Sequence, residues 1–188
     1  MSWSEQLKEA TRSAHQDLDL SFNRLDLTDP LDYRLFLDAH ASVLPGCEAT
    51  LAASGAHTLL PDWHNRIRAP ALADDLATVG AQRLFTTSSA TPIEPAAAFG
   101  MMYVLEGSRL GGAVLAQRVQ HNADPLCRAA TRYLRHGTGL RLWPLFIISL
   151  ENADCIRDKI DAAVASALFT FGLFANAARL AKTELPGA

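Results

Sequence analysis

Apolar residues recur at helical intervals along most of the chain, and this pattern predicts an all-α fold. At the N-terminus, Ser2 and Glu5 have the spacing of a capping box. Apolar positions follow every three or four residues, so we expect a helix over residues 3–19. A second helical period covers about residues 31–54 and contains Pro45. Because proline lacks the N–H of an interior helical hydrogen bond, Pro45 should end or kink that helix just before it.

The rest of the chain continues this pattern, with interruptions at proline and glycine. Residues 55–80 predict a loop followed by shorter helices, in which Pro61 and Pro70 should be early helical residues. Residues 86–94 (TTSSATPIE) have the composition of a linker. Further helices are expected over residues 92 to about 121, 125–135, 143–152 and 155–183. No run of alternating β-branched residues indicates a sheet, so we expect a single domain, residues 1–188, folded as a helical bundle.

Composition and charge exclude several classes of protein. Apolar residues make up 49% and charged residues 20% of the 188 residues, which is typical of a soluble globular domain. A net charge of −3 without a basic stripe gives no case for nucleic-acid binding. The three cysteines, Cys47, Cys127 and Cys155, form no C-x-x-C pair, which argues against a disulfide framework or a cysteine zinc site. The N-terminal segment resembles neither a signal peptide nor a membrane span, so we expect a cytoplasmic protein without a membrane partner.

One predicted helix contains four unusually small residues, Gly107, Ser108, Gly111 and Gly112, in the stretch YVLEGSRLGGAVL. Each glycine costs about 0.8–1 kcal/mol relative to alanine in a helix interior, so the cluster needs an explanation. Successive residues advance by about 100°, which gathers the four into a notch along one side of the helix. Such a notch commonly allows close helix packing, but it is also wide enough for a flat ligand to lie against the backbone.

The first predicted helix offers a candidate ligand-binding pair. Lys8 and His15 are seven residues apart, so they share a face about 10.5 Å apart along the helix. A neutral imidazole is the commonest metal ligand in proteins, and a lysine can pair with an acidic group of the same ligand. The other histidines lack the spacing of a zinc site or of a di-iron bundle. They are His40, His57, His64, His121 and His136.

Two stretches resemble the haem oxygenases. LKEATRSAH, residues 7–15, is similar to the proximal-helix motif of that family, and YVLEGSRLGGAVL, residues 103–115, is similar to its distal helix. The form of the distal stretch resembles the bacterial branch, which includes enzymes associated with bacteriophytochromes. The two stretches lie about ninety residues apart, as in the family, and the chain has the family's length. ALFTFGLFANAARL, residues 167–180, resembles the last helix of the family.

This resemblance implies O2- and electron-dependent cleavage of haem b to biliverdin, iron and carbon monoxide. It implies that His15 is the axial ligand of the haem iron and that Lys8 pairs with a haem propionate. Gly107 and Gly111 would be the catalytic glycines whose backbone approaches the iron-bound oxygen, with Ser108 beside them. Further haem-binding positions implied by the resemblance are Arg12, Tyr103, Gly112, Tyr133 and Phe174. The implied partners are an electron donor such as a ferredoxin or a flavin reductase, and a bacteriophytochrome as the acceptor of biliverdin.

The chain departs from the family in two places. Ser108 stands where many haem oxygenases have an aspartate that orders the proton-delivering water. A serine hydroxyl can hold one water but cannot buffer a proton near neutral pH. Either water alone suffices, or Glu106, Arg109 or another group organises the network. The last helix also lacks the basic residues that serve some members as a second propionate partner. Alternatives for that role are Arg12, Arg132, Arg135, Lys159 and Arg179.

Two other functions remain open from the sequence. A non-catalytic haem-binding or haem-delivery protein could use the same fold, and the serine at position 108 is compatible with it. A related all-α enzyme of the thiaminase type would need a cysteine nucleophile, for which Cys127 is the candidate on a polar helix.

Overall fold

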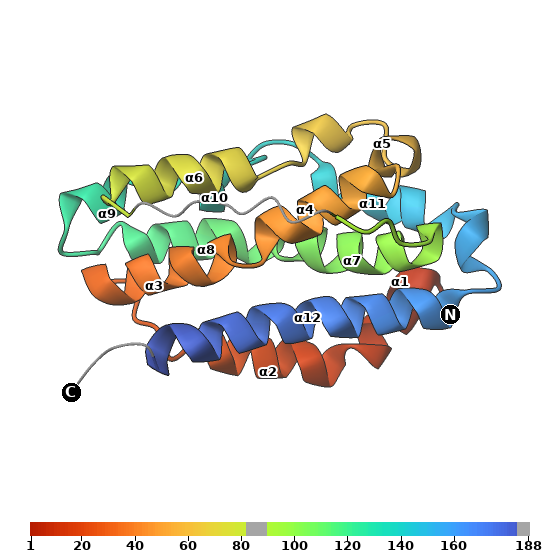
Figure 1. Cartoon of the computed structure of the whole chain (residues 1–188), viewed down its shortest axis with the longest axis horizontal. Helices are drawn as coiled ribbons and strands as arrows, with labels where there is room; N and C mark the ends of the chain where they lie inside the picture. Colours follow the sequence, from red (N-terminus) through yellow and green to blue (C-terminus); the bar gives the residue numbers. More distant parts are fainter. Residues whose placement is uncertain (82–89, 184–188) are drawn as a thin grey trace.

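The computed structural model describes residues 1–81 and 90–183, and every regular element within these ranges is a helix. The longest, α12 (Ile160–Thr183), packs against α2 (Arg12–Phe22), α3 (Pro30–Ala41) and α7 (Pro95–Gly107). In Figure 1, α12 and α2 run side by side along one edge of the molecule. Helix α8 (Arg109–Val119) continues from α7 on the side away from that pair. The all-α bundle predicted from the apolar periodicity is confirmed.

Shorter helices complete the bundle. Helix α10 packs against α6 and α8, and α11 packs against α7 and α1. Their bounds are α1 (Trp3–Ala10), α4 (Leu44–Ala53), α5 (Ala56–Leu59), α6 (Ala69–Thr78), α9 (Pro125–Ala129), α10 (Arg132–Arg135) and α11 (Leu142–Glu151). Two 3-10 turns, η1 (Trp63–Asn65) and η2 (Asp154–Ile156), lie between them.

The first two predicted helices are each divided in two. The Thr11 hydroxyl donates to the Leu7 carbonyl at 2.7 Å, and this type of side-chain bond bends a helix, so the helix expected over residues 3–19 becomes α1 and α2. The interruption expected at Pro45 is confirmed, because α3 ends at Ala41 and α4 begins at Leu44.

Further expectations about helix bounds were wrong. The helix expected from residue 155 begins only at Ile160, after the 3-10 turn η2. The single helix from residue 92 to about 121 is interrupted at Ser108, where the hydroxyl donates to the Leu105 carbonyl at 2.8 Å beside the weak helix former Gly107. Residues 125–135 form two short helices instead of one. Pro61 precedes the turn η1 instead of starting a helix, whereas Pro70 lies in the first turn of α6 as predicted. Of the predicted linker, residues 86–89 lie outside the described residues, and residues 90–94 are not helical.

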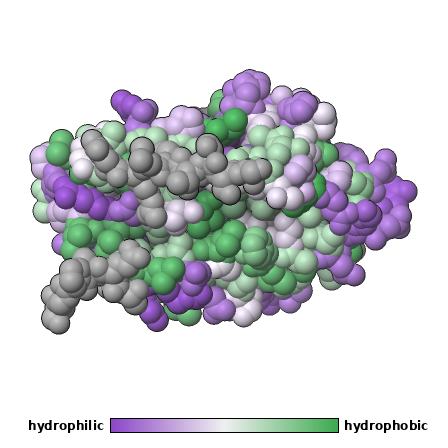
Figure 2. Space-filling model, in the orientation of Figure 1, coloured by the Kyte–Doolittle hydropathy of each residue, from purple (hydrophilic) through white to green (hydrophobic). Residues whose placement is uncertain are grey.

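Close packing at the centre of the bundle explains one glycine. A Cβ at Gly100 would lie 2.0 Å from the carbonyl oxygen of Ala163, so only glycine allows α7 and α12 to approach this closely. The segment Ile160–Ala181 of α12 is long and apolar enough to cross a membrane by length and composition. Its contacts with α2, α3 and α7 are those of a central helix in a bundle. On the face shown in Figure 2, apolar residues gather over the middle and polar residues are concentrated toward its ends.

Candidate functional site

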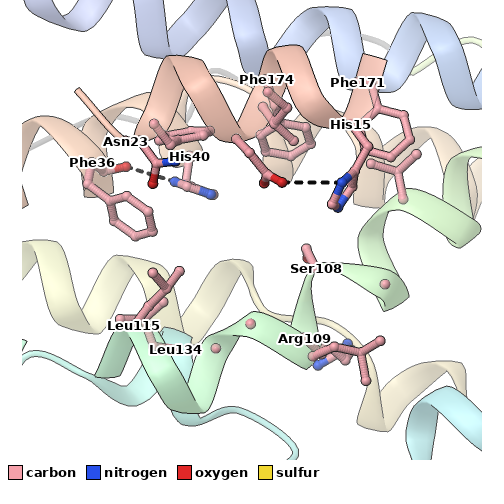
Figure 3. Close-up of a pocket in the computed structure, with 18 of the residues that line it drawn as sticks. His15, Asn23, Phe36, His40, Ser108, Arg109, Leu115, Leu134, Phe171 and Phe174 are labelled. Carbon is pink, nitrogen blue, oxygen red and sulfur yellow. Dashed lines mark hydrogen bonds and ion pairs between the residues drawn. The ribbon is translucent and has the colours of Figure 1, made fainter. Parts of the chain in front are cut away.

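A cavity of about 770 Å³ lies between the helices at the N-terminus and the α7–α8 segment. Its volume is within the range of about 300–1,000 Å³ that small-molecule and cofactor sites occupy. In Figure 3, His15 and Ser108 lie on opposite walls of this cavity, with Phe171 and Phe174 beside the histidine and Leu115 on the other wall. Both stretches that the sequence singled out therefore face the same space.

The wall formed by α2 presents His15. Its Nδ1 lies 3.3 Å from Oδ2 of Asp19, one helical turn later, and its ring meets the edge of Phe171 with the centroids 5.6 Å apart. A carboxylate on one ring nitrogen orients a histidine and leaves the other nitrogen, Nε2, for a ligand. The side chain is 59% exposed, so the imidazole is accessible from the cavity.

The glycines of the opposite wall differ in their surroundings. A Cβ at Gly111 would meet no atom within 4 Å, and a Cβ at Gly107 would make ordinary contact with Trp143 at 3.5 Å. At Gly112, a Cβ would lie 2.4 Å from the carbonyl oxygen of Leu134. Gly111 therefore leaves open space in the cavity wall, whereas Gly112, predicted to bind the ligand, serves close packing of α8 against α10 even though it borders the cavity.

Ser108 is joined to an arginine that sequence reasoning missed. The hydroxyl of Ser108 accepts a hydrogen bond from Nη2 of Arg68 at 3.0 Å, and the same nitrogen donates to the Leu105 carbonyl at 2.9 Å. Arg68 is only 4% exposed, and its guanidinium lies 5.2 Å from the centre of the Tyr133 ring. The sequence carries no signal for this contact, because Arg68 and Ser108 are 40 residues apart.

Behind this wall, a charged network holds the α7–α8 junction. Glu106 is 1% exposed and accepts from Nη1 of Arg66 at 2.6 Å and from Nε and Nη2 of Arg109, each at 3.0 Å. Arg66 also forms two hydrogen bonds with the carboxylate of Asp62, at 2.7 and 2.8 Å. Glu106 does not line the cavity, so of the two alternatives for organising water, only Arg109 reaches it.

The inner end of the cavity contains a second histidine that the sequence did not single out. His40 is buried, its Nδ1 lies 2.8 Å from the Phe36 carbonyl, and its ring lies 5.3 Å from Tyr133 and 5.6 Å from Phe174, centroid to centroid. Burial, assisted by the positive charge of Arg68, lowers the pKa of His40 to about 4. The imidazole is therefore neutral near pH 7. Tyr133 and Phe174 line the cavity as the resemblance implied.

Basic residues mark the cavity rim. Lys8 and Arg12 are exposed and line the cavity, with Arg12 paired to Glu9. Tyr103 lines it as well, and burial raises the pKa of this phenol. Arg118, at the end of α8, is a rim residue that the sequence did not suggest. The alternatives Arg132, Arg135, Lys159 and Arg179 do not line the cavity.

The remaining cysteine hypothesis finds no support in the geometry. Cys127 is fully buried, its sulfur lies 3.9 Å from the Pro30 carbonyl, and it does not line the cavity. Burial raises the pKa of the thiol, which disfavours the thiolate that a nucleophile requires.

The cavity has the features that a haem needs. His15 can supply one nitrogen ligand, Gly111 leaves the opposite side open, and the aromatic side chains Phe171 and Phe174 provide apolar contact. Exposed basic residues at the rim suit the carboxylates of the macrocycle. Within residues 1–81 and 90–183, no three His, Cys, Asp or Glu side chains cluster to hold a bare metal ion.

Comparison with known proteins leads to the same fold. No protein-family model matches the chain. A heme oxygenase of Xanthomonas campestris pv. campestris (strain 8004) is 34% identical over 97 residues, a match that covers 52% of this chain and 58% of that protein. The structure of the NO- and CO-bound heme oxygenase of Neisseria meningitidis superimposes with a TM-score of 0.79 at 20% identity, covering 100% of this chain and 96% of the other. The chain thus has the all-α fold of a haem oxygenase.

Proposed function

We propose that the protein is a haem oxygenase, which uses O2 and electrons to open haem b to biliverdin, iron and carbon monoxide. The observation that carries the proposal is one cavity in which a carboxylate-oriented histidine, His15, faces a wall left open at Gly111. The named function of the similar proteins from Xanthomonas and Neisseria supports it.

In this proposal, different residues around the cavity would bind the iron, the propionates and the macrocycle of the haem. His15 would bind the iron through Nε2 while Asp19 accepts from Nδ1, which keeps the ring oriented and electron-rich. Lys8 and Arg12 would pair with the propionates at the rim. Tyr103 would contact the macrocycle near the rim and Phe174 near the inner end. When bound, haem would supply both the redox-active iron and the ring that is opened.

The opposite wall would control the entry of small molecules and the delivery of protons. Gly111 leaves open space in this wall, and Gly107 adds no side chain beside Trp143, so these glycines would leave room for a small molecule next to bound haem. The Ser108 hydroxyl accepts from Arg68 and donates to the Leu105 carbonyl, so a lone pair remains for one water molecule. Because no carboxylate among the described residues lines this part of the wall, the proton would reach the site through water held by Ser108 and its neighbours.

A spectroscopic assay tests the proposal directly. Purified protein is titrated with haem, and the Soret band gives the affinity and stoichiometry. Ascorbate or reduced ferredoxin is then added in air with catalase present, and biliverdin is measured by its red absorption. We expect one haem per chain and formation of biliverdin, with no product in an anaerobic control.

The two ways of failing have different meanings. Bound haem that never yields biliverdin with either reductant would favour a haem carrier on the same fold. Absence of saturable haem binding would overturn both functions.

The proposal extends to partners and location. A ferredoxin or flavin reductase would dock at the rim near Lys8 and Arg12, which are exposed and line the cavity. Product release to a bacteriophytochrome and a cytoplasmic location are parts of the same proposal.

A further inference from the structure

Arg68 differs from the other buried arginines because no carboxylate of the described residues forms an ion pair with its guanidinium. Arg66 is held by Asp62 and Glu106, and Arg109 is held by Glu106. Among the described residues, the Arg68 guanidinium contacts the Leu105 carbonyl, the Ser108 hydroxyl and the face of Tyr133, which are all neutral. No carboxylate among the described residues forms an ion pair with this guanidinium, so the nearby buried Glu48 offsets its positive charge only from a distance.

This charge is held in place by two buried carboxylates that bind the backbone. Glu48 accepts the backbone N–H of Arg68 at 2.7 Å and that of Ala69 at 3.0 Å. Asp75 accepts the backbone N–H of Tyr133 at 2.8 Å, which fixes the ring under the guanidinium. The backbone at both ends of the cation–π contact is thus anchored, and turning the Arg68 side chain to solvent would break its hydrogen bonds to Leu105 and Ser108.

Because no described carboxylate reaches the guanidinium of Arg68, an anion that enters the cavity can supply the direct ion pair that this buried cation lacks. The pKa values of neighbouring groups reflect the positive charge of Arg68. Burial lowers the pKa of His40, His136 and Arg109, and the charge of Arg68 lowers all three further. All three side chains line the same cavity. Asp19, a carboxylate that also lines the cavity, pairs with His15 on the opposite wall, so an anion beside Ser108 would lie closest to the positive side chains of Arg68 and Arg109.

We propose that Arg68 makes the Ser108 side of the cavity a binding site for a small inorganic anion. The serine has a role in this site, because an aspartate at position 108 would pair with the guanidinium, which lies 3.0 Å from the hydroxyl oxygen, and cancel its charge. Where the family resemblance predicts a carboxylate, this chain has a serine, which leaves the positive charge of Arg68 available to an anion. This inference rests on the proposed function, since the anion would share the cavity with bound haem.

Anion titrations of the ferric haem complex test this site. Fluoride and azide are added to the wild type and to Arg68→Met, which retains a long apolar stem, and the dissociation constants are read from the Soret shift. Losing a charge-assisted hydrogen bond should weaken both anions by about tenfold or more. Arg68→Lys retains the positive charge but not the planar guanidinium, so its affinity for the anions should lie between those of the wild type and Arg68→Met. Carbon monoxide, a neutral ligand of the ferrous form, should bind all three proteins within about threefold of one another.

Two matched variants separate charge from shape. Ser108→Asp should weaken fluoride and azide by a similar factor, whereas Ser108→Asn, of nearly the same shape without the charge, should remain close to the wild type. Arg141→Met removes one positive charge from an exposed position that does not line the cavity, and solvent screening should keep its effect below about twofold. Far-UV circular dichroism and the Soret extinction establish that each variant is folded and loaded.

The outcomes separate the two proposals. If haem binds but Arg68→Met and Ser108→Asp keep the wild-type anion affinities, the anion site is refuted while the proposed function stands. Equal weakening of the anions and of carbon monoxide would also refute it, because the residue would then act only through packing. A wild type that does not bind haem overturns the proposed function, and the anion site with it.

Discussion

Gly111 and Gly112 are adjacent on α8 and form a matched pair of positions with opposite surroundings. The Cβ of an alanine would enter open space at position 111, but would lie 2.4 Å from the Leu134 carbonyl oxygen at position 112. We expect Gly111→Ala to stabilise the haem-free protein. Gly112→Ala should leave the stability of the haem-free protein unchanged or lower it. The comparison tests which face of the helix packs and which faces the ligand.

The magnitude follows from two opposing terms. Alanine is favoured over glycine by about 0.8–1 kcal/mol in a helix interior, and both variants gain this amount. Only Gly112→Ala must displace the backbone of α10, and overpacking of this kind costs about 1–3 kcal/mol. Because the propensity term cancels, the free energies of unfolding of the two variants should differ by about 1–3 kcal/mol, the overpacking term alone.

Urea denaturation followed by circular dichroism measures this difference on the haem-free protein, with the slope m as a check on two-state behaviour. For a chain of this length, each kcal/mol corresponds to about 2–4 °C in Tm. Gly111→Leu extends the test, because it should impair carbon monoxide binding to the ferrous haem complex without lowering the stability of the haem-free protein. If Gly111→Ala destabilised as much as Gly112→Ala, the open-wall interpretation of Gly111 would be wrong.

Three further outcomes follow from the same cavity. His15→Ala should lose the axial-ligand signature of the ferric haem spectrum with the helical content unchanged, and added imidazole should restore it; an unchanged spectrum would mean another ligand. Asp19→Asn should raise the reduction potential of the iron, because a neutral partner leaves the imidazole less electron-rich; potentiometry measures this, and a potential equal to the wild type would contradict the assigned orientation. Since burial lowers the pKa of His40 from 6.5 to about 4, its neutral form contributes stability that is complete above pH 6.5 and is lost as the pH falls through 4. Denaturation at pH 7 and pH 4 should show a loss of about 3 kcal/mol that His40→Phe lacks; an equal pH dependence in that variant would refute it.

The helical architecture could be predicted because its signals are local. Apolar spacing, the capping box at Ser2 and the proline at the start of α6 depend on residues within a few turns of one another. Local signals also singled out the two candidate stretches: the small residues around Gly111 are unusual in a helix, and Lys8 and His15 have the spacing of one helical face. The interruption at Ser108 was missed, because apolar spacing continues through it while the hydroxyl bonds the backbone.

The composition of the cavity wall was decided by tertiary structure. Whether a small residue opens a cavity or permits close packing depends on what lies opposite, and periodicity cannot distinguish Gly111 from Gly112 one position away. Arg68 and His40 look like an ordinary charged residue and an ordinary histidine in the sequence. Their roles arise because the fold buries them against Tyr133, which lies more than 60 residues further along the chain. Local sequence thus specifies the helices, while the contacts between distant helices determine which side chains face the ligand and what charge they bring to it.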